Sequence, residues 1–154
     1  MNNTNPTAQA HAYSEDAIFA LVSSVREQAN NLLSTMLEEQ GVVDLLPAHG
    51  AVFHALYQEN PLRMTVLAER IGRRKSTLTS LINTLEARGY CRREADAEDS
   101  RAQMVFLTEK GEALREIQHA ISEVALAKAW QGIDAGKRRV CLEVLASVLD
   151  NLRR

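Results

Sequence analysis

One stretch of the sequence combines small hydrogen-bonding side chains with helical spacing. At about 3.6 residues per turn, the apolar residues between positions 78 and 85 share one face of a helix, which leaves a polar face opposite. The polar residues on that face are Ser76, Thr77, Thr79, Ser80 and Asn83. Exposed helix faces usually carry Glu and Lys, because these residues favour helix formation. Short hydroxyl and amide groups cost helicity, but they suit close approach to base edges in the major groove of DNA.

A basic segment surrounds this polar face. Residues 61–93 contain eight basic and two acidic residues, a net charge of +6, whereas the whole chain carries −2. A basic segment within an acidic protein is the electrostatic signature of nucleic-acid binding. Cations close to a helix N-terminus favour phosphate, because the unpaired N–H groups there also attract anions. The candidate phosphate-binding residues are Arg63, Arg73, Arg74, Lys75 and Arg92.

A charged turn between two short runs of extended character follows the predicted helix. This pattern predicts a β-hairpin over about residues 90–107. The turn is rich in acids, which DNA repels, so we expect its arginine, Arg101, to make the contact, in a narrow minor groove. Asp99 lies two residues before Arg101 and is expected to hold the guanidinium bidentately. An Asp-x-Arg sequence alone is a weak signal, because most such pairs are surface ion pairs.

The surrounding periodicity predicts a mainly α-helical fold with a small β-hairpin wing. A short helix over 65–71, begun by Thr65 and closed by Gly72, precedes the polar-faced helix and completes a helix-turn-helix. Further helices are predicted over residues 14–40, 47–58, 108–130 and from 134 to the end, with Ser14, Thr108 and Asp134 as N-caps. The first of these helices is apolar around much of its circumference, which indicates burial on two sides and therefore dimerisation.

Composition limits the classes of function. Apolar residues make up 45% of the 154 residues and charged residues 25%, as in globular proteins. We expect no membrane span and no signal peptide, and the two cysteines fit the cytoplasm. His49 and His54 are five residues apart, on different faces of a helix, so no metal site is expected. No catalytic motif is present, so we expect neither enzyme activity nor a cofactor.

Residues 45–111 resemble the MarR family of winged-helix bacterial transcription regulators. The matching segments are LPAHG at 46–50, MTVLAERIG at 64–72, KSTLT at 75–79, LEARGY at 85–90, and DSR at 99–101 followed by FLTEKG at 106–111. The last block is the most specific of them. The chain departs from the family pattern at Arg74, because many members have Ser at that position, the N-cap of the recognition helix.

The resemblance implies a homodimer whose terminal helices intertwine, with residues 76–85 as the recognition helix and Arg101 in the minor groove. It also implies repression that a small, often aromatic or phenolic, ligand relieves. Two recognition helices about one helical turn apart would select a near-palindromic operator of duplex DNA. We therefore expect a flexible tail over 1–13, a dimerisation helix and linker over 14–46, a DNA-binding lobe over 47–109 and C-terminal dimerisation helices over 110–154.

The sequence alone leaves several assignments open. His49, Phe53, Tyr57 and Trp130 are candidates to line an effector pocket, but the aromatic residues fit a core equally well. Cys91 is expected to be an inert buried thiol, although its two arginine neighbours would favour a redox-sensitive thiolate if it were exposed. Cys141 is expected in the core. The rival functions are a thiol-based redox regulator and a dimeric interaction module without specific DNA binding.

Overall fold

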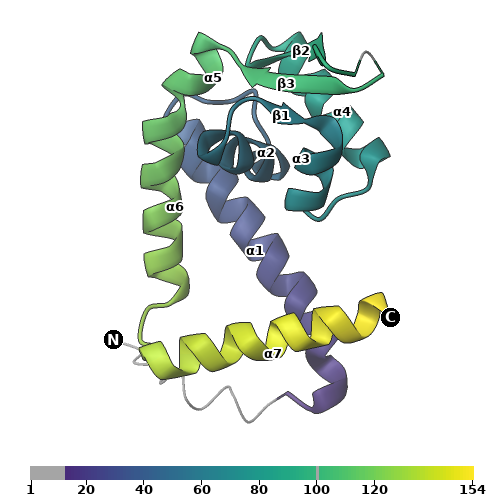
Figure 1. Cartoon of the computed structure of the whole chain (residues 1–154). Helices are drawn as coiled ribbons and strands as arrows, with labels where there is room; N and C mark the ends of the chain where they lie inside the picture. The colour runs from purple at the N-terminus through teal and green to yellow at the C-terminus, as the bar shows by residue number, and fades with distance from the viewer. Residues whose placement is uncertain (1–12, 100) are drawn as a thin grey trace.

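The computed structural model describes residues 13–99 and 101–154 (Figure 1). The predicted fold class is confirmed, because the structure is mainly helical with a small antiparallel sheet. The helices are the 3₁₀ turn η2 (Glu15–Ala17), α1 (Ile18–Glu39), α2 (Pro47–Gln58), α3 (Met64–Arg70), α4 (Lys75–Ala87), α5 (Glu109–Ala113), α6 (Arg115–Ala129) and α7 (Ala135–Arg153). The strands are β1 (Leu62–Arg63), β2 (Cys91–Ala95) and β3 (Gln103–Leu107). The tail predicted over residues 1–13 lies, apart from Tyr13, outside the described residues.

The sheet has one strand more than the sequence predicts. Strands β2 and β3 form the predicted hairpin, with Cys91 paired to Leu107, and β1 pairs with the other edge of β3, with Leu62 opposite Val105. The order is therefore β1-β3-β2, and all neighbours are antiparallel. A strand of two residues is too short to show an alternation of apolar and polar residues, so the sequence did not predict β1. It ties the hairpin to the start of α3.

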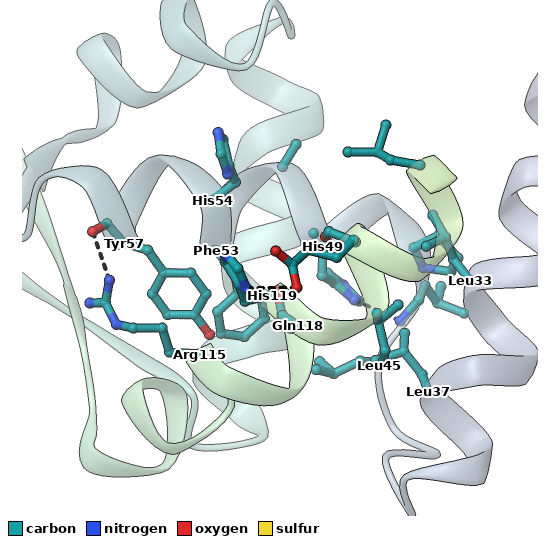
Figure 2. A pocket seen from close by; sticks show the side chains of 18 of the residues that line it. Leu33, Leu37, Leu45, His49, Phe53, His54, Tyr57, Arg115, Gln118 and His119 are labelled. Atoms are coloured by element: carbon teal, nitrogen blue, oxygen red, sulfur yellow. Dashed lines mark hydrogen bonds and ion pairs between the residues drawn. The ribbon is translucent and has the colours of Figure 1, made fainter. Parts of the chain in front are cut away.

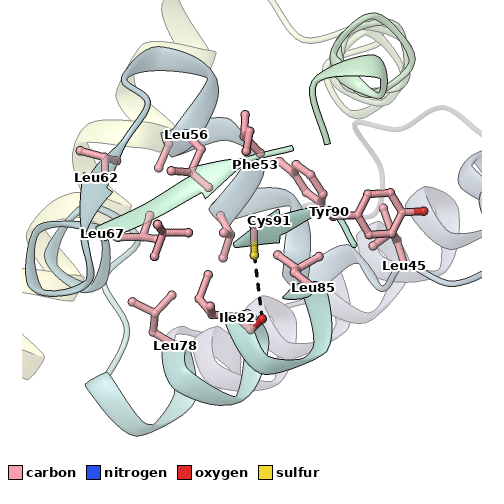
Figure 3. Packing of buried hydrophobic residues seen from close by; sticks show 14 of the residues in the cluster. Leu45, Phe53, Leu56, Leu62, Leu67, Leu78, Ile82, Leu85, Tyr90 and Cys91 are labelled. Carbon is pink, nitrogen blue, oxygen red and sulfur yellow. Dashed lines mark hydrogen bonds between the residues drawn. The ribbon is translucent and has the colours of Figure 1, made fainter. Parts of the chain in front are cut away.

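Helices α2, α3 and α4 pack with the sheet around one hydrophobic core (Figure 3). Its largest wholly buried side chains are Phe53, Leu56, Leu67, Leu78, Ile82, Leu85, Val52 and Val105. The rings of Phe53 and Tyr90 form a T-shaped contact, with 5.9 Å between their centroids. Gly111 of α5 lies so close to the sheet that a Cβ atom there would clash with the Tyr90 carbonyl oxygen. Only glycine allows this approach.

The helix ends agree with the predicted caps at two of four places. The Thr108 hydroxyl accepts a hydrogen bond from the Gly111 N–H at 3.2 Å, and Asp134 accepts one from Lys137 at 3.0 Å. Thr65 does not cap α3, which begins one residue earlier at Met64. Ser14 caps no backbone N–H, because its hydroxyl contacts the Asp16 carboxylate instead.

Most of the length of the long helices lies outside the lobe formed by α2 to β3, although α1 contributes Leu37 and α6 contributes Ile121 to the core. α1 and α6 pack along each other where they leave the lobe, and α7 lies at their far end from the wing (Figure 1). The helix predicted over 108–130 is two helices, α5 and α6, which meet at the buried Leu114. Cys141 on α7 is exposed, so its predicted place in the core is wrong for the single chain. Across the described residues, no helix has the length and apolar character needed to cross a membrane.

Candidate functional site

The predicted polar face of α4 exists in the structure. Leu78, Ile82 and Leu85 are buried and fix α4 against the core. Ser76, Thr77, Ser80 and Asn83 are exposed on the other side, and Thr79 is half-buried beside them. Because the apolar stripe anchors the helix, its small polar side chains face outward over a length of about two turns.

The hydroxyl groups on this face are oriented by their own helix. Thr79 Oγ1 donates to the Lys75 carbonyl at 2.8 Å, and Ser80 Oγ donates to the Ser76 carbonyl at 3.2 Å. A hydroxyl has one proton to donate and two lone pairs, so both residues present acceptors to anything that approaches. Amino groups of cytosine and adenine are the donors available in the major groove. Asn83 adds both a donor and an acceptor to this face.

The N-terminus of α4 carries three free cations. Arg74 occupies the N-cap position, as predicted, and no side chain caps the first turn. Arg73, Arg74 and Lys75 are exposed, and none forms an ion pair within the described residues. The first N–H groups of a helix have no intrahelical partner, so this end combines fixed dipoles with mobile positive charge. Such an arrangement suits a phosphate group.

The other two predicted phosphate-binding residues are already bound to carboxylates. Arg63 Nε lies 2.6 Å from Oδ2 of the buried Asp96. Arg92 Nε lies 2.9 Å from Glu94 Oε1, and its guanidinium covers the ring of Phe106 at 4.5 Å from the centroid. The Arg63–Asp96 pair joins β1 to the turn of the hairpin, and the contact of Arg92 with Phe106 joins β2 to β3. The sequence contains no signal for the Arg63–Asp96 pair, because its partners are far apart in the chain.

The predicted Asp99–Arg101 guanidinium pair is wrong. Asp99 Oδ1 instead accepts a hydrogen bond from the Arg101 backbone N–H at 3.0 Å. A short aspartate side chain reaches the amide two residues ahead more easily than the end of a long side chain, which is how aspartate stabilises turns. Asp96 acts similarly at 2.8 Å from the Glu98 N–H, and that bond, reinforced by Arg63, holds the pKa of Asp96 below its usual value. The Arg101 side chain is left exposed.

A small hollow joins the wing to the helix-turn-helix. Its volume is about 220 Å³, and its lining includes Arg63, Lys75 and Arg101 together with Met64, Thr65, Ala102 and Gln103. Three predicted DNA-contacting cations from separate elements therefore surround one space. Two of them, Lys75 and Arg101, form no ion pair within the described part of the chain.

A larger cavity of about 690 Å³ lies between α1, α2 and α6 (Figure 2). Three of the four predicted pocket residues line it, namely His49, Phe53 and Tyr57. Trp130 does not, because α6 carries it to the far end, where its ring faces Arg138. The sequence missed most of the lining, because it comes from three helices; it includes Leu33, Leu37, Leu45, Arg115, Gln118 and Ile121.

Most polar groups of this cavity have partners in the protein. Tyr57 Oη donates to the Gly111 carbonyl at 3.0 Å, and burial raises the pKa of Tyr57. Arg115 stacks on the Tyr57 ring, 4.5 Å from its centroid, and donates to both oxygens of Glu112 at 2.5 and 2.9 Å. His49 Nδ1 accepts the Leu46 N–H at 3.0 Å, and burial lowers the pKa of His49.

The geometry of the described residues supports neither a reactive cysteine nor a metal site. Cys91 is buried, as predicted, and burial raises the pKa of its thiol to about 11. The reactive thiolate is therefore scarce at neutral pH. Across the residues that the structure describes, no three His, Cys, Asp or Glu side chains converge as metal ligands would.

Comparison with known proteins identifies the family. Residues 47–102 match the model of the MarR family. The chain is 33% identical over 101 residues to the HTH-type transcriptional regulator TtmR of Methylorubrum extorquens (strain PA1). That match covers 66% of this chain and 51% of the relative, so the chain spans about half the length of the curated relative it matches.

Solved structures share the fold over most of the chain. Reduced AbfR bound to DNA superposes with a TM-score of 0.76 at 20% identity, covering 90% of this chain and 94% of that one. PcaV of Streptomyces coelicolor, in complex with its natural ligand, gives 0.77 at 22% identity, covering 84% and 89%. Residues 47–102 form a domain of the MarR family, and the lobe that contains them is a winged helix-turn-helix. This is a family of transcriptional regulators, in agreement with the prediction that the chain is not an enzyme.

Proposed function

We propose that the protein is a homodimeric regulator of transcription that binds duplex DNA through α4 and the wing, and that a small effector releases it. One observation carries the proposal: the outward face of α4 is polar and uncharged, while free cations stand at its N-terminus and at the wing tip. A surface of this kind provides base contacts in the middle and phosphate contacts at its edges. AbfR, which shares the fold, was solved bound to DNA.

In this account the residues of the lobe divide into three roles. The face formed by Ser76, Thr77, Thr79, Ser80 and Asn83 contacts bases in the major groove. Arg73, Arg74 and Lys75 neutralise phosphates, and Arg101 enters the minor groove. Asp99 shapes the turn that carries Arg101. Arg63 and Arg92 contribute less, because each must first leave a carboxylate partner.

The helices outside the lobe support the dimer. Residues 14–46 and 110–154 are assigned to dimerisation because their large apolar side chains are exposed in the single chain and α7 buries none of its residues. Contiguous exposed apolar surface on this scale marks an interface. The exposed residues on these helices include Phe19, Val22, Val25, Val124, Leu126, Val140, Leu142, Val144, Leu149 and Leu152. A two-fold dimer would present two α4 helices and select a near-palindrome with half-sites roughly 10 bp apart.

The cavity between α1, α2 and α6 is the proposed effector site. BpsR of Bordetella bronchiseptica has the same fold with a TM-score of 0.72 at 19% identity, and its DNA binding is regulated by 6-hydroxynicotinic acid. The cavity borders the loop before α2, where Asp44 accepts a hydrogen bond from Tyr90 Oη at 2.7 Å and its carbonyl accepts one from Arg88 at the end of α4. A ligand that favours one arrangement of this loop shifts the population of DNA-competent dimers. We assign the protein the role of a repressor, as the family resemblance implies.

The rival functions receive less support. A redox regulator needs an accessible low-pKa thiol, and Cys91 is buried with a raised pKa. If the protein were an interaction module that does not bind DNA, the free cations of the lobe would have no ligand.

Selection from a random duplex library tests the proposal, because the method requires no operator sequence at the start. The purified full chain is expected to enrich a near-palindrome whose half-sites lie roughly 10 bp apart. Replacing Asn83 with Ala is expected to relax the selected sequence at one position of each half-site. Recovery of unbiased sequences by the wild type would contradict specific recognition.

A further inference from the structure

Ser80 is the residue of α4 that points most directly away from the protein. At about 100° per residue, the direction opposite the buried stripe of α4 lies between Ser76 and Ser80, and it is closer to Ser80. Ser80 is exposed, Ser76 lies one turn before it, and Asn83 lies about one turn after it. Because the buried stripe fixes how α4 is rotated, a major groove that receives this face meets Ser80 near its centre.

The hydroxyl proton of Ser80 has a fixed direction. Ser80 Oγ donates to the Ser76 carbonyl one turn back, at 3.2 Å, and a carbonyl oxygen can only accept. The next turn repeats the arrangement, because Thr84 Oγ1 donates to the Ser80 carbonyl at 3.1 Å. A serine hydroxyl has one proton and two lone pairs, so Ser80 Oγ presents only acceptor positions to a base.

The rest of α4 neither replaces nor masks this acceptor. Between Lys75 and Arg88 the sequence contains no Lys or Arg, the side chains that bind O6 and N7 of guanine. The only acid in that stretch is Glu86, whose carboxylate accepts the Arg93 backbone N–H at 2.9 Å and pairs with the Arg93 side chain. Glu86 is therefore not available to a cytosine amino group, and the middle of the helix offers no cation to guanine.

The base groups exposed in the major groove divide into two classes. Adenine N6 and cytosine N4 are amino donors, whereas guanine O6 and thymine O4 are keto acceptors. A keto oxygen opposite Ser80 Oγ places lone pairs against lone pairs, unless Ser80 withdraws its proton from the Ser76 carbonyl and loses that hydrogen bond. An amino group opposite Ser80 requires no such change.

We infer that Ser80 makes the protein select an amino base, adenine or cytosine, over a keto base, guanine or thymine, at one base pair of each operator half-site. The inference rests on the proposed function, in which the outward face of α4 lies in the major groove. It adds a chemical rule for one position of the operator, set by the direction of a single hydroxyl proton. The expected preference is about three- to tenfold, the size of one net hydrogen bond.

Three substitutions of Ser80 test this rule by selection of the full chain's targets from a random duplex library. Ser80→Ala removes the hydroxyl and is expected to abolish the amino preference at one position of each half-site, while the other positions keep theirs. Ser80→Thr keeps a hydroxyl that can bond to the same carbonyl, and it should keep the preference. Ser80→Lys offers only donors, and it should shift the preference to guanine. Thermal unfolding establishes that the three variants are folded.

Base analogues measure the contact itself, in the operator that the wild type selects. The amino base at the Ser80-dependent position is replaced by its counterpart without the amino group, purine for adenine or 2-pyrimidinone for cytosine. The wild type is expected to lose about three- to tenfold in affinity, and Ser80→Ala is expected to lose much less. Weaker pairing of the analogue affects both proteins alike, so the difference between them isolates the contact. Ser80→Ala should keep the salt dependence of the wild type, because it removes no phosphate contact.

Three results would overturn the inference: the same selected operator for the wild type and Ser80→Ala, a keto base at the position that depends on Ser80, or equal losses of the two proteins on the analogue. In each of them the proposed function survives, because the wild type still binds a specific sequence. The proposed function fails by a different result, the absence of any enriched sequence for the wild type, and the inference then fails with it.

Discussion

The winged lobe and the long helices of this chain differ in how far they bury their apolar side chains. In the lobe, helices α2, α3 and α4 enclose side chains that are wholly buried, such as Phe53, Leu67 and Ile82. In α7, which is 19 residues long, no residue is buried, although Leu142 and Leu149 follow helical spacing. The lobe is therefore complete within one chain, whereas the long helices present an apolar surface that needs a partner.

This difference separates two physical tasks. A surface that contacts DNA must be rigid, so α4 is fixed by its own core and its polar face is held in register. A surface that joins two copies can stay incomplete until they meet. The large cavity lies between the two regions, bordered by α1 and α6 on one side and by α2 on the other. A ligand there is placed to alter how the lobe sits on the long helices.

The largest predicted effect concerns the lobe core. Ile82→Ala removes a wholly buried side chain from α4 and is expected to lower the free energy of unfolding by about 2–5 kcal/mol. Leu142→Ala on α7, where the side chain is 58% exposed, is the matched control and should change it little in dilute solution. Urea denaturation measures both. Equal losses would mean that the two regions do not differ as described.

The long helices are tested by a charge on their apolar face. Leu149→Glu is expected to raise the dimer dissociation constant about a hundredfold or more, roughly 3 kcal/mol, because a carboxylate would be buried at the interface. Val66→Glu is a control, since Val66 is an exposed apolar residue of α3, outside the residues assigned to dimerisation. Sedimentation of both variants at micromolar concentration gives the answer, and an unchanged dimer in Leu149→Glu would place the interface elsewhere.

Within the lobe, we expect the loss of DNA affinity on replacing an arginine to depend on whether that arginine already forms an ion pair. Arg101→Ala removes a free cation and is expected to weaken DNA binding by about 1–3 kcal/mol and to reduce its dependence on salt. Arg92→Ala removes a cation already paired with Glu94, so its effect should be smaller. Anisotropy titrations at several salt concentrations compare them. A larger loss for Arg92→Ala would reverse the assignment of roles.

The smallest effect is a dependence of stability on pH. Burial lowers the pKa of His49 in the folded state, so the unfolded chain takes up the proton first as the pH falls. The stability that His49 contributes is complete above its unfolded pKa of about 6.5 and is lost as the pH falls through the lowered folded value. His49→Gln should flatten the stability curve just below pH ~6.5. Denaturation on either side of this pH measures the effect, and parallel curves would contradict the prediction.

Acidic side chains act in the same direction at lower pH. The Arg93 side chain lowers the pKa of Glu86, and the Glu98 N–H lowers that of Asp96. The folded state therefore loses stability again below pH ~4.5, as these carboxylates take up protons more readily in the unfolded chain. This second loss should be identical in His49→Gln and the wild type, which separates it from the histidine effect.

Local patterns predicted the parts of this molecule that depend on neighbours in sequence. The opposite faces of α4 follow from the spacing of Leu78, Ile82 and Leu85, and the Thr108 and Asp134 caps follow from side chains beside their own helix ends. The resemblance of short sequence segments predicted the MarR family. These features need only helix geometry, hydrogen bonding over three residues, and a recognisable sequence block.

The features that sequence missed depend on distant parts of the chain. The Arg63–Asp96 ion pair exists because β1 joins β3, and β1 is too short to be predicted. The aspartate at position 99 was expected to bind a guanidinium, but turn geometry offers it a backbone N–H first. Trp130 was a candidate to line the cavity, but it lies at the C-terminal end of α6, away from the cavity.

Fluorescence anisotropy with duplex DNA from upstream of the protein's own gene tests the central claim most directly. The wild type is expected to bind that duplex more tightly than a scrambled one, with a steep salt dependence, and Arg101→Ala is expected to bind it more weakly. Equal weak affinity for both duplexes would mean that the operator lies elsewhere or that the basic face binds DNA non-specifically. No binding even at low salt would contradict the claim that α4 and the wing bind DNA.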